Sequence, residues 1–89
     1  MKTLDFIERL KAVYHLPSDY AAAKKLGVTK QNISRIRNHG QTLDDRAAFE
    51  IAELLELDPA QVVAYMNLER AERANDKNLI LFWQSYAHA

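Results

Sequence analysis

Apolar residues recur at intervals of three and four along most of this chain. Leu4, Ile7 and Leu10 form the first such series, and this spacing places their side chains on one face of a helix. The chain holds only two glycines and two prolines, and it lacks the apolar-polar alternation of strands. We therefore predict an all-α fold. The expected helices span residues 4–14, 19–26, 30–38, 43–55, 59–74 and 77–87.

Capping residues mark the start of most of these helices. A serine, threonine or aspartate just before a helix accepts hydrogen bonds from its free N–H groups, and proline fits the first helical position. Gly27 follows the second helix, where a left-handed residue commonly ends it. The expected N-caps are Thr3, Ser18, Thr29, Thr42 with Asp45 as a weak capping-box partner, and Asp58 followed by Pro59.

Length and composition favour one soluble domain. The 89 residues are enough for a small core. The chain contains no cysteine, which excludes disulfides and thiolate metal sites. The longest apolar run, LILFW, is far shorter than a membrane span, and the first ten residues hold no apolar signal-peptide core. We therefore expect a soluble, cytoplasmic protein.

The charges are unevenly distributed, although they sum to zero. Residues 1–40 carry eight Lys/Arg and three Asp/Glu, whereas residues 41–75 carry three Lys/Arg and eight Asp/Glu. A basic face that binds a polyanion, with an acidic back, would give this division; so would ordinary fluctuation in a small protein. The acidic helices predicted at 43–55 and 59–74 leave a different class of function open. They would suit a protein-binding module, such as an antirepressor or an antitoxin-like adaptor, which is the alternative to polyanion binding.

Two short predicted helices, residues 19–26 and 30–38, are separated by only three residues. A pair of helices joined by such a turn has the geometry of a helix-turn-helix. Ala23 is small enough to let the second of these helices cross close to the first. Ile33 and Ile36 lie three residues apart and form a narrow apolar stripe on the second helix. Most of that helix is therefore expected to face outward.

The outward side chains of residues 30–38 have the chemistry of base recognition. A helix fits the major groove of DNA, where Arg35 and Lys30 can reach both acceptors of guanine and Gln31 can bond to adenine. Lys24 adds attraction to phosphate without sequence preference. The candidate DNA-binding residues are Thr29, Lys30, Gln31, Asn32, Ser34, Arg35, Arg37 and Asn38.

The stretch SDYAAAKKLGVTKQNISRIRNHG resembles the helix-turn-helix of the lambda-repressor-like (Cro/C1, XRE) family of phage and bacterial regulators. The likeness continues into TLDDRAAFEIAELLELDPAQVVA and covers about residues 3–74. More narrowly, the chain looks like small regulators of filamentous phages and prophages. The resemblance implies a five-helix DNA-binding domain at residues 1–74, with the helix-turn-helix at 19–38, and an additional C-terminal helix at 75–89.

By the same resemblance, we expect a sequence-specific transcriptional regulator, a phage or prophage repressor that binds double-stranded DNA. A domain with one reading helix covers few base pairs, so we expect a homodimer on a pseudo-palindromic operator. One position departs from the family. Many members begin the second helix with a glutamine that touches the DNA backbone, whereas this chain has Asp19. A carboxylate is unfavourable beside phosphate, so we assign Asp19 no DNA contact.

The last predicted helix, residues 77–87, is apolar around much of its circumference. Some of its side chains must pack on the other helices, and an exposed remainder would suit a dimer seam; the two roles are compatible. The candidate dimer-interface residues are Leu79, Phe82, Trp83 and Tyr86.

No other residues form a catalytic or metal-binding pattern. His15, His39 and His88 lie far apart in the sequence and lack ligand spacing. The glutamates at three-residue spacing in the fourth helix fit a solvated face better than an acid-base pair, and there is no glycine-rich phosphate loop. We therefore predict no enzyme activity, no metal and no cofactor.

Overall fold

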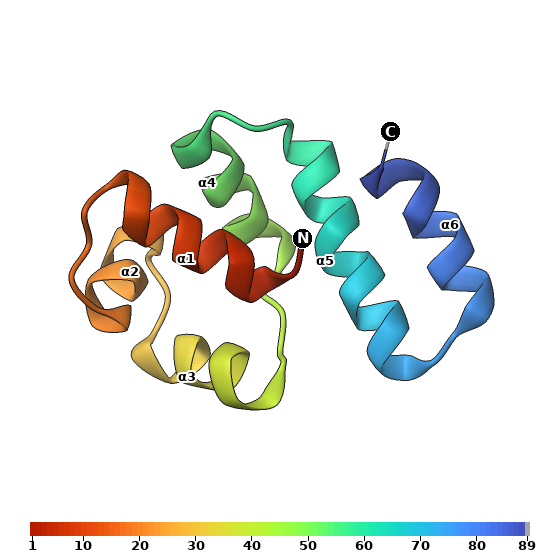
Figure 1. Cartoon of the computed structure of the whole chain (residues 1–89), viewed down its shortest axis with the longest axis horizontal. Coiled ribbons are helices and arrows are strands. Elements are labelled where there is room, and N and C mark those ends of the chain that lie inside the picture. Colours follow the sequence, from red (N-terminus) through yellow and green to blue (C-terminus); the bar gives the residue numbers. More distant parts are fainter. Residues whose placement is uncertain (89) are drawn as a thin grey trace.

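The computed structural model describes residues 1–88, and in that range the only regular secondary structure is helical (Figure 1). The all-α prediction is confirmed. The second, fifth and sixth helices have the predicted bounds. The first begins and ends one residue earlier than predicted, the third ends one residue later, and the fourth begins two residues later. The helices are α1 (Thr3–Val13), α2 (Asp19–Leu26), α3 (Lys30–His39), α4 (Asp45–Leu55), α5 (Pro59–Ala74) and α6 (Lys77–Ala87).

Three of the predicted N-caps are confirmed by hydrogen bonds. Each cap side chain accepts a bond from a backbone N–H in the first turn of the helix that follows. Gly27 has a φ of 71° and ends α2 in the left-handed conformation that its position predicted. The confirmed bonds are Ala21 N–H to Ser18 Oγ (3.1 Å), Asn32 N–H to Thr29 Oγ1 (3.1 Å) and Ala60 N–H to Asp58 Oδ1 (3.0 Å).

The prediction that Thr3 caps α1 is wrong. Thr3 is the first residue inside the helix, and it is fully buried. Its N–H and its hydroxyl both donate to Oε1 of Glu69 in α5, at 2.8 and 2.7 Å. The N-cap is Lys2, whose N–H donates to the Asp5 carboxylate at 2.8 Å. A distant carboxylate has therefore taken the threonine that local sequence rules assign to capping.

The prediction that Thr42 caps α4 is wrong for a similar reason. The Thr42 hydroxyl accepts a hydrogen bond from Nε of Arg70, at 2.7 Å. Arg70 also donates to the carbonyl oxygen of Leu43, which precedes the N-cap of the helix. Asp44 is the N-cap, accepting from the N–H of Ala47 at 2.9 Å. The helix consequently begins two residues later than predicted.

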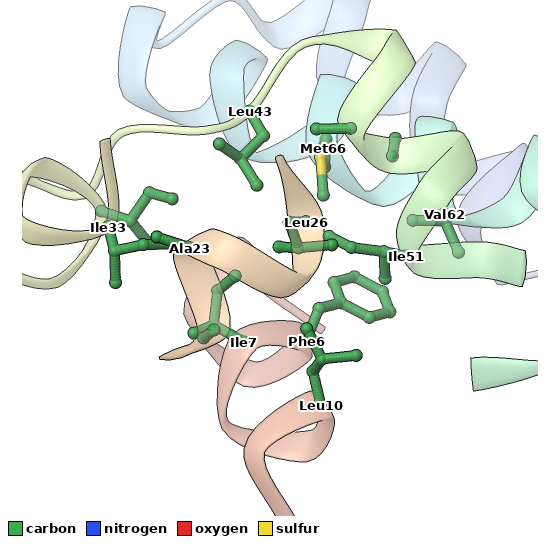
Figure 2. Packing of buried hydrophobic residues seen from close by; sticks show 14 of the residues in the cluster. Phe6, Ile7, Leu10, Ala23, Leu26, Ile33, Leu43, Ile51, Val62 and Met66 are labelled. Carbon is green, nitrogen blue, oxygen red and sulfur yellow. The ribbon is translucent and has the colours of Figure 1, made fainter. Parts of the chain in front are cut away.

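The main core lies where the inner faces of α1–α5 meet. Each helix contributes residues at the three- and four-residue spacing seen in the sequence, and Ala22 and Ala23 allow other helices to approach α2 closely. A fully buried large apolar side chain contributes about 1.5–3 kcal/mol. Figure 2 shows members of this cluster, including Phe6, Ile7, Leu10, Ala23, Leu26, Ile33, Leu43, Ile51, Val62 and Met66.

The last helix is attached to the rest of the fold through a single neighbour. Within the described chain, α6 contacts no helix other than α5, and it lies on the far side of α5 from the other helices (Figure 1). Ile80, Trp83 and Ala87 of α6 pack against a second, smaller cluster on α5 that includes Ala64 and Leu68. The α5–α6 pair is thus a helical hairpin that extends from the five-helix core.

None of the helices in residues 1–88 is both long enough and apolar enough to cross a bilayer.

The buried pair of Thr3 and Glu69 yields a prediction about stability. Replacing Glu69 with alanine leaves two buried donors of Thr3 without an acceptor, and each such orphan costs about 1–3 kcal/mol. We expect Glu69→Ala to lower the free energy of unfolding by about 2–4 kcal/mol in urea denaturation. Glu72→Ala, an exposed position on the same helix, is the control and should change it by less than about 0.5 kcal/mol. Equal effects of the two substitutions would contradict this assignment.

Candidate nucleic-acid interface

The helix α3 is anchored to the core by a narrow set of contacts. Ile33 and Ile36 are almost completely buried, with 0% and 3% of their surface exposed. Val28, in the turn before the helix, is partly buried against the same cluster. The turn itself contains only residues 27–29, because the left-handed Gly27 reverses the chain quickly. The rest of α3 faces away from the core.

Five of the predicted site residues form one continuous exposed face on α3. Residues three and four apart on a helix are neighbours, so these five cover the side opposite the two isoleucines. Two of them are in contact, since Nδ2 of Asn38 donates to Oγ of Ser34 at 3.2 Å. We call this set the reading face: Lys30, Gln31, Ser34, Arg35 and Asn38, all of them exposed.

Thr29 and Asn32 lie at one border of the reading face and form a capping box. Oδ1 of Asn32 accepts hydrogen bonds from the N–H of Thr29 at 3.1 Å and from its hydroxyl at 2.7 Å. The Thr29 hydroxyl in turn accepts from the N–H of Asn32. Both were predicted to contact DNA. The structure gives them a role in starting α3, and Asn32 is only partly exposed.

Arg37 lies at the opposite border and is paired within the protein. Its Nε donates to Oδ2 of Asp19 and its Nη2 to Oδ1, both at 2.9 Å. Nη2 also donates to the Glu8 carboxylate of α1. Lys11, also of α1, contacts Oδ1 of Asp19 at 3.0 Å. The predicted DNA residue Arg37 therefore joins α3 to two other helices.

The same contacts explain why an aspartate stands at the start of α2. Hydrogen bonds from Arg37 are the largest effect that lowers the pKa of Asp19, followed by those from Lys11, while burial opposes them. The Asp19 carboxylate in turn raises the pKa of Arg37, with Glu8 adding to the effect. No local pattern could have revealed this pair, because its members are 18 residues apart.

The segment that contains the reading face carries charge of one sign. Residues 20–43 contain five Lys/Arg and no carboxylate. Two of these cations rest over aromatic rings: Nζ of Lys24 is 5.6 Å from the Tyr20 ring centre, and Nζ of Lys25 is 4.5 Å from that of Tyr14. Since Arg37 is neutralised by its partners, Lys24, Lys25, Lys30 and Arg35 supply the positive field of this surface.

A second surface of different character lies on α4. A hollow of about 410 Å³ is lined by Arg46, Phe49, Glu50 and Glu53. Phe49 is 52% exposed although it is large and apolar. This surface is acidic and lacks the amides and hydroxyls of α3.

Among residues 1–88, no three His, Cys, Asp or Glu side chains are grouped so that they could hold a metal ion.

Comparison with known proteins identifies one phage relative and no family. No family model matches the chain, and no solved structure matches it. A protein of Pseudoalteromonas phage PM2, described as "Uncharacterized protein Gp-c", is 24% identical over 83 residues, which cover 92% of this chain and 90% of that protein. This likeness assigns neither a family nor an activity. The resemblance to lambda-repressor-like regulators therefore stays a prediction.

The lowered pKa of Asp19 makes stability depend on pH. Aspartate has a usual value of 3.8, and a carboxylate whose pKa is lower in the folded state stabilises the fold above its unfolded pKa. That contribution is lost as the pH falls through the lowered, folded-state value. We expect the difference in free energy of unfolding between wild type and Asp19→Asn to be constant from pH 7 to about 5 and to shrink below about 4.

Urea denaturation at several pH values measures this difference. Asp45→Asn is the matched control, because Asp45 is also the first residue of its helix and its loss removes the same favourable charge from a helix N-terminus. If the difference in free energy of unfolding between wild type and Asp19→Asn stays constant down to pH 2, the ion pairs of Asp19 do not stabilise the folded state.

Proposed function

We propose that this protein is a sequence-specific, double-stranded-DNA-binding transcriptional regulator of the lambda-repressor-like class, and that α3 enters the major groove. One observation carries the proposal. Among the residues of the short helix α3, only Ile33 and Ile36 are buried in the core, and the helix presents a continuous polar and cationic face to solvent. A helix anchored in this way exposes the width of surface that a groove about 12 Å wide accommodates.

Each member of the reading face suits a DNA contact. The Arg35 guanidinium can donate two bonds to O6 and N7 of guanine, and the Gln31 amide can bond to N6 and N7 of adenine. Lys30, in the first turn of α3, can reach either a guanine or a phosphate. Ser34 and Asn38 are short enough for groups that pass close to the helix. Lys24 and Lys25 lie outside the reading face and add attraction that is independent of sequence.

Three further observations support the regulator class. The order of α1–α5, with a three-residue turn between α2 and α3, agrees with the domain that the sequence resemblance implies. The only carboxylate at the start of α2, Asp19, is paired within the protein and does not project a free charge toward a phosphate. The similar protein Gp-c comes from a phage, which fits a phage or prophage repressor acting on DNA in the bacterial cytoplasm.

A dimer follows from the size of the reading surface. One reading helix contacts only a few base pairs, and two copies on a pseudo-palindromic operator would read half-sites about 34 Å apart. The exposed side of α6 is the candidate seam. Leu79, Phe82 and Tyr86 are 47%, 51% and 56% exposed and lie at helical spacing. Trp83 is partly buried against α5, and the centre of its ring is 5.0 Å from that of Phe82. It therefore lies between the α5 contact and the exposed side of α6.

The base-reading role predicts different effects for two cations. Arg35→Ala should weaken binding to the preferred sequence by about 1–3 kcal/mol and relax the preference at one base pair. Lys24→Ala should weaken binding to all sequences alike and reduce its dependence on salt. Selection from a random DNA pool supplies the preferred sequence, and gel shifts against that fragment and a shuffled one measure both effects. If the two substitutions act identically on both fragments, the assignment of base reading to Arg35 is wrong.

The dimer seam is tested with exposed side chains, so that folding is not disturbed. Phe82→Ser removes an aromatic ring that is about half exposed at the seam. It should weaken self-association about tenfold or more. Leu81→Ser is the matched control: Leu81 is 67% exposed, on the same helix, and lies outside the stripe. Sedimentation equilibrium measures the association. Equal weakening by both substitutions, or by neither, would move the seam away from α6.

A second function is favoured by the hollow on α4. The exposed Phe49, which lines the hollow together with Glu50 and Glu53, suits a protein partner with basic and apolar groups, as an antirepressor or an antitoxin-like adaptor would require. Gel shifts with random DNA at low and high salt separate the two functions. A DNA regulator should bind random DNA weakly and lose that binding as salt rises. A protein-binding module should show no shift at either concentration.

A further inference from the structure

We propose that Glu8, Lys11, Asp19 and Arg37 form a clasp that orients α3 for base reading, and that Arg37 acts on recognition through this clasp and not through a DNA phosphate. The inference rests on the proposed DNA-binding function. It makes Arg37 and Asp19 positioning residues, since neither is assigned a contact with DNA.

The clasp connects three helices through groups with fixed geometry. The Arg37 guanidinium is planar, and two parallel hydrogen bonds to one carboxylate fix both its distance and its direction. Those bonds, both 2.9 Å, tie α3 to the first residue of α2. Glu8 and Lys11 extend the tie to α1, from which they contact Arg37 and Asp19 respectively.

The apolar anchors lie on one side of α3 and constrain its rotation about its own axis less than contacts on two sides would. Ile33 and Ile36 project to the same side of the helix and lie within one turn of each other. Two flexible contacts on one side oppose withdrawal of a helix better than they oppose its rotation. Arg37 is the residue after Ile36, so its side chain leaves the helix about 100° away around the axis. A fixed bond at that angle resists the rotation that the isoleucines permit.

Rotation matters because base contacts tolerate little error. A two-bond contact requires its groups within about 0.5 Å and 10–20° of the productive geometry. Arg35 and Gln31 are on the same rigid helix as Arg37, so a small roll of α3 moves their ends by more than this tolerance. Contacts to phosphate by flexible lysines depend on α3 orientation far less. The clasp should therefore affect selectivity between sequences more than general affinity.

The charges of the clasp disfavour a direct phosphate contact by Arg37. Two of its nitrogens already donate to carboxylates, and the four groups together have no net charge. A phosphate that approached Arg37 would meet the Asp19 and Glu8 carboxylates at close range, and like charges repel. Releasing the arginine would leave those two carboxylates facing DNA without a partner.

Asp19→Asn separates the two roles of Arg37, with Asp45→Asn as the matched control at the first position of another helix. The probes are the fragment that the wild type selects from a random pool and a shuffled fragment of equal length. We expect Asp19→Asn to reduce affinity for the selected fragment about five- to twentyfold and to change affinity for the shuffled fragment less than about twofold. If Arg37 binds phosphate, removing its acidic partner should instead strengthen binding to both, and that result would overturn the proposal.

Arg37→Lys provides an independent test of the same idea. Lysine keeps the positive charge but cannot form the two-bond fork. A positioning role predicts that Arg37→Lys loses selectivity much as Asp19→Asn does, with the salt dependence of binding unchanged. A phosphate contact predicts that lysine preserves affinity for both fragments. Circular dichroism before each titration confirms that the variants are folded.

A measurement without DNA keeps failure of the clasp distinct from failure of the proposed function. Residual dipolar couplings of backbone amides report the orientation of α3 relative to α1 in solution. We expect altered or averaged couplings in α3 for Asp19→Asn and Arg37→Lys, and wild-type couplings for Asp45→Asn. Unchanged α3 orientation in both variants would overturn the clasp. If the orientation changes but the wild type selects no DNA fragment, the regulator function falls and the structural tie remains.

Discussion

The helix α3 is attached to the core by only two buried side chains, Ile33 and Ile36, and the contacts around it compensate for this narrow attachment. A helix that keeps most of its surface in water gains little from burial, and here two isoleucines supply nearly all of it. The other helices of the core must therefore supply most of the buried apolar surface. Small residues on α2 make this possible, because Ala22 and Ala23 let the helices pack closely over a short distance. Hydrogen bonds from Arg37 to Asp19 and Glu8 add polar contacts between α3 and its neighbours.

Two adjacent residues on α5 join distant parts of the chain by further polar contacts. Glu69 accepts from the buried start of α1, and Arg70 donates to Thr42 and Leu43 before α4. In this way the longest helix holds segments that precede and follow α3. Every buried side-chain nitrogen and oxygen among the described residues has a hydrogen-bond partner, so these contacts carry no unpaired buried group.

The parts of the fold that follow local rules were predictable from sequence, and those that depend on distant partners were not. The starts of α2, α3 and α5 were predicted because each cap bonds to its own helix. Thr3 and Thr42 satisfy the same local rule, yet their hydroxyls bond to Glu69 and Arg70, which are 66 and 28 residues away. All five residues of the reading face could be listed in advance because helical spacing determines which side chains share a side. The pairing that removes Arg37 from that face could not.

The attachment of α6 to α5 alone has a consequence for how the molecule can vary. Substitutions on the outer side of α6 reach α3 only through α5 and the core, so their effects on α3 should be small and nearly additive with changes made there. The contacts within the α5–α6 hairpin are also close in sequence, and local contacts form quickly during folding. Under the proposed function, related chains could thus exchange their last helix, and with it the proposed dimer seam, without altering the face of α3 that is proposed to contact DNA.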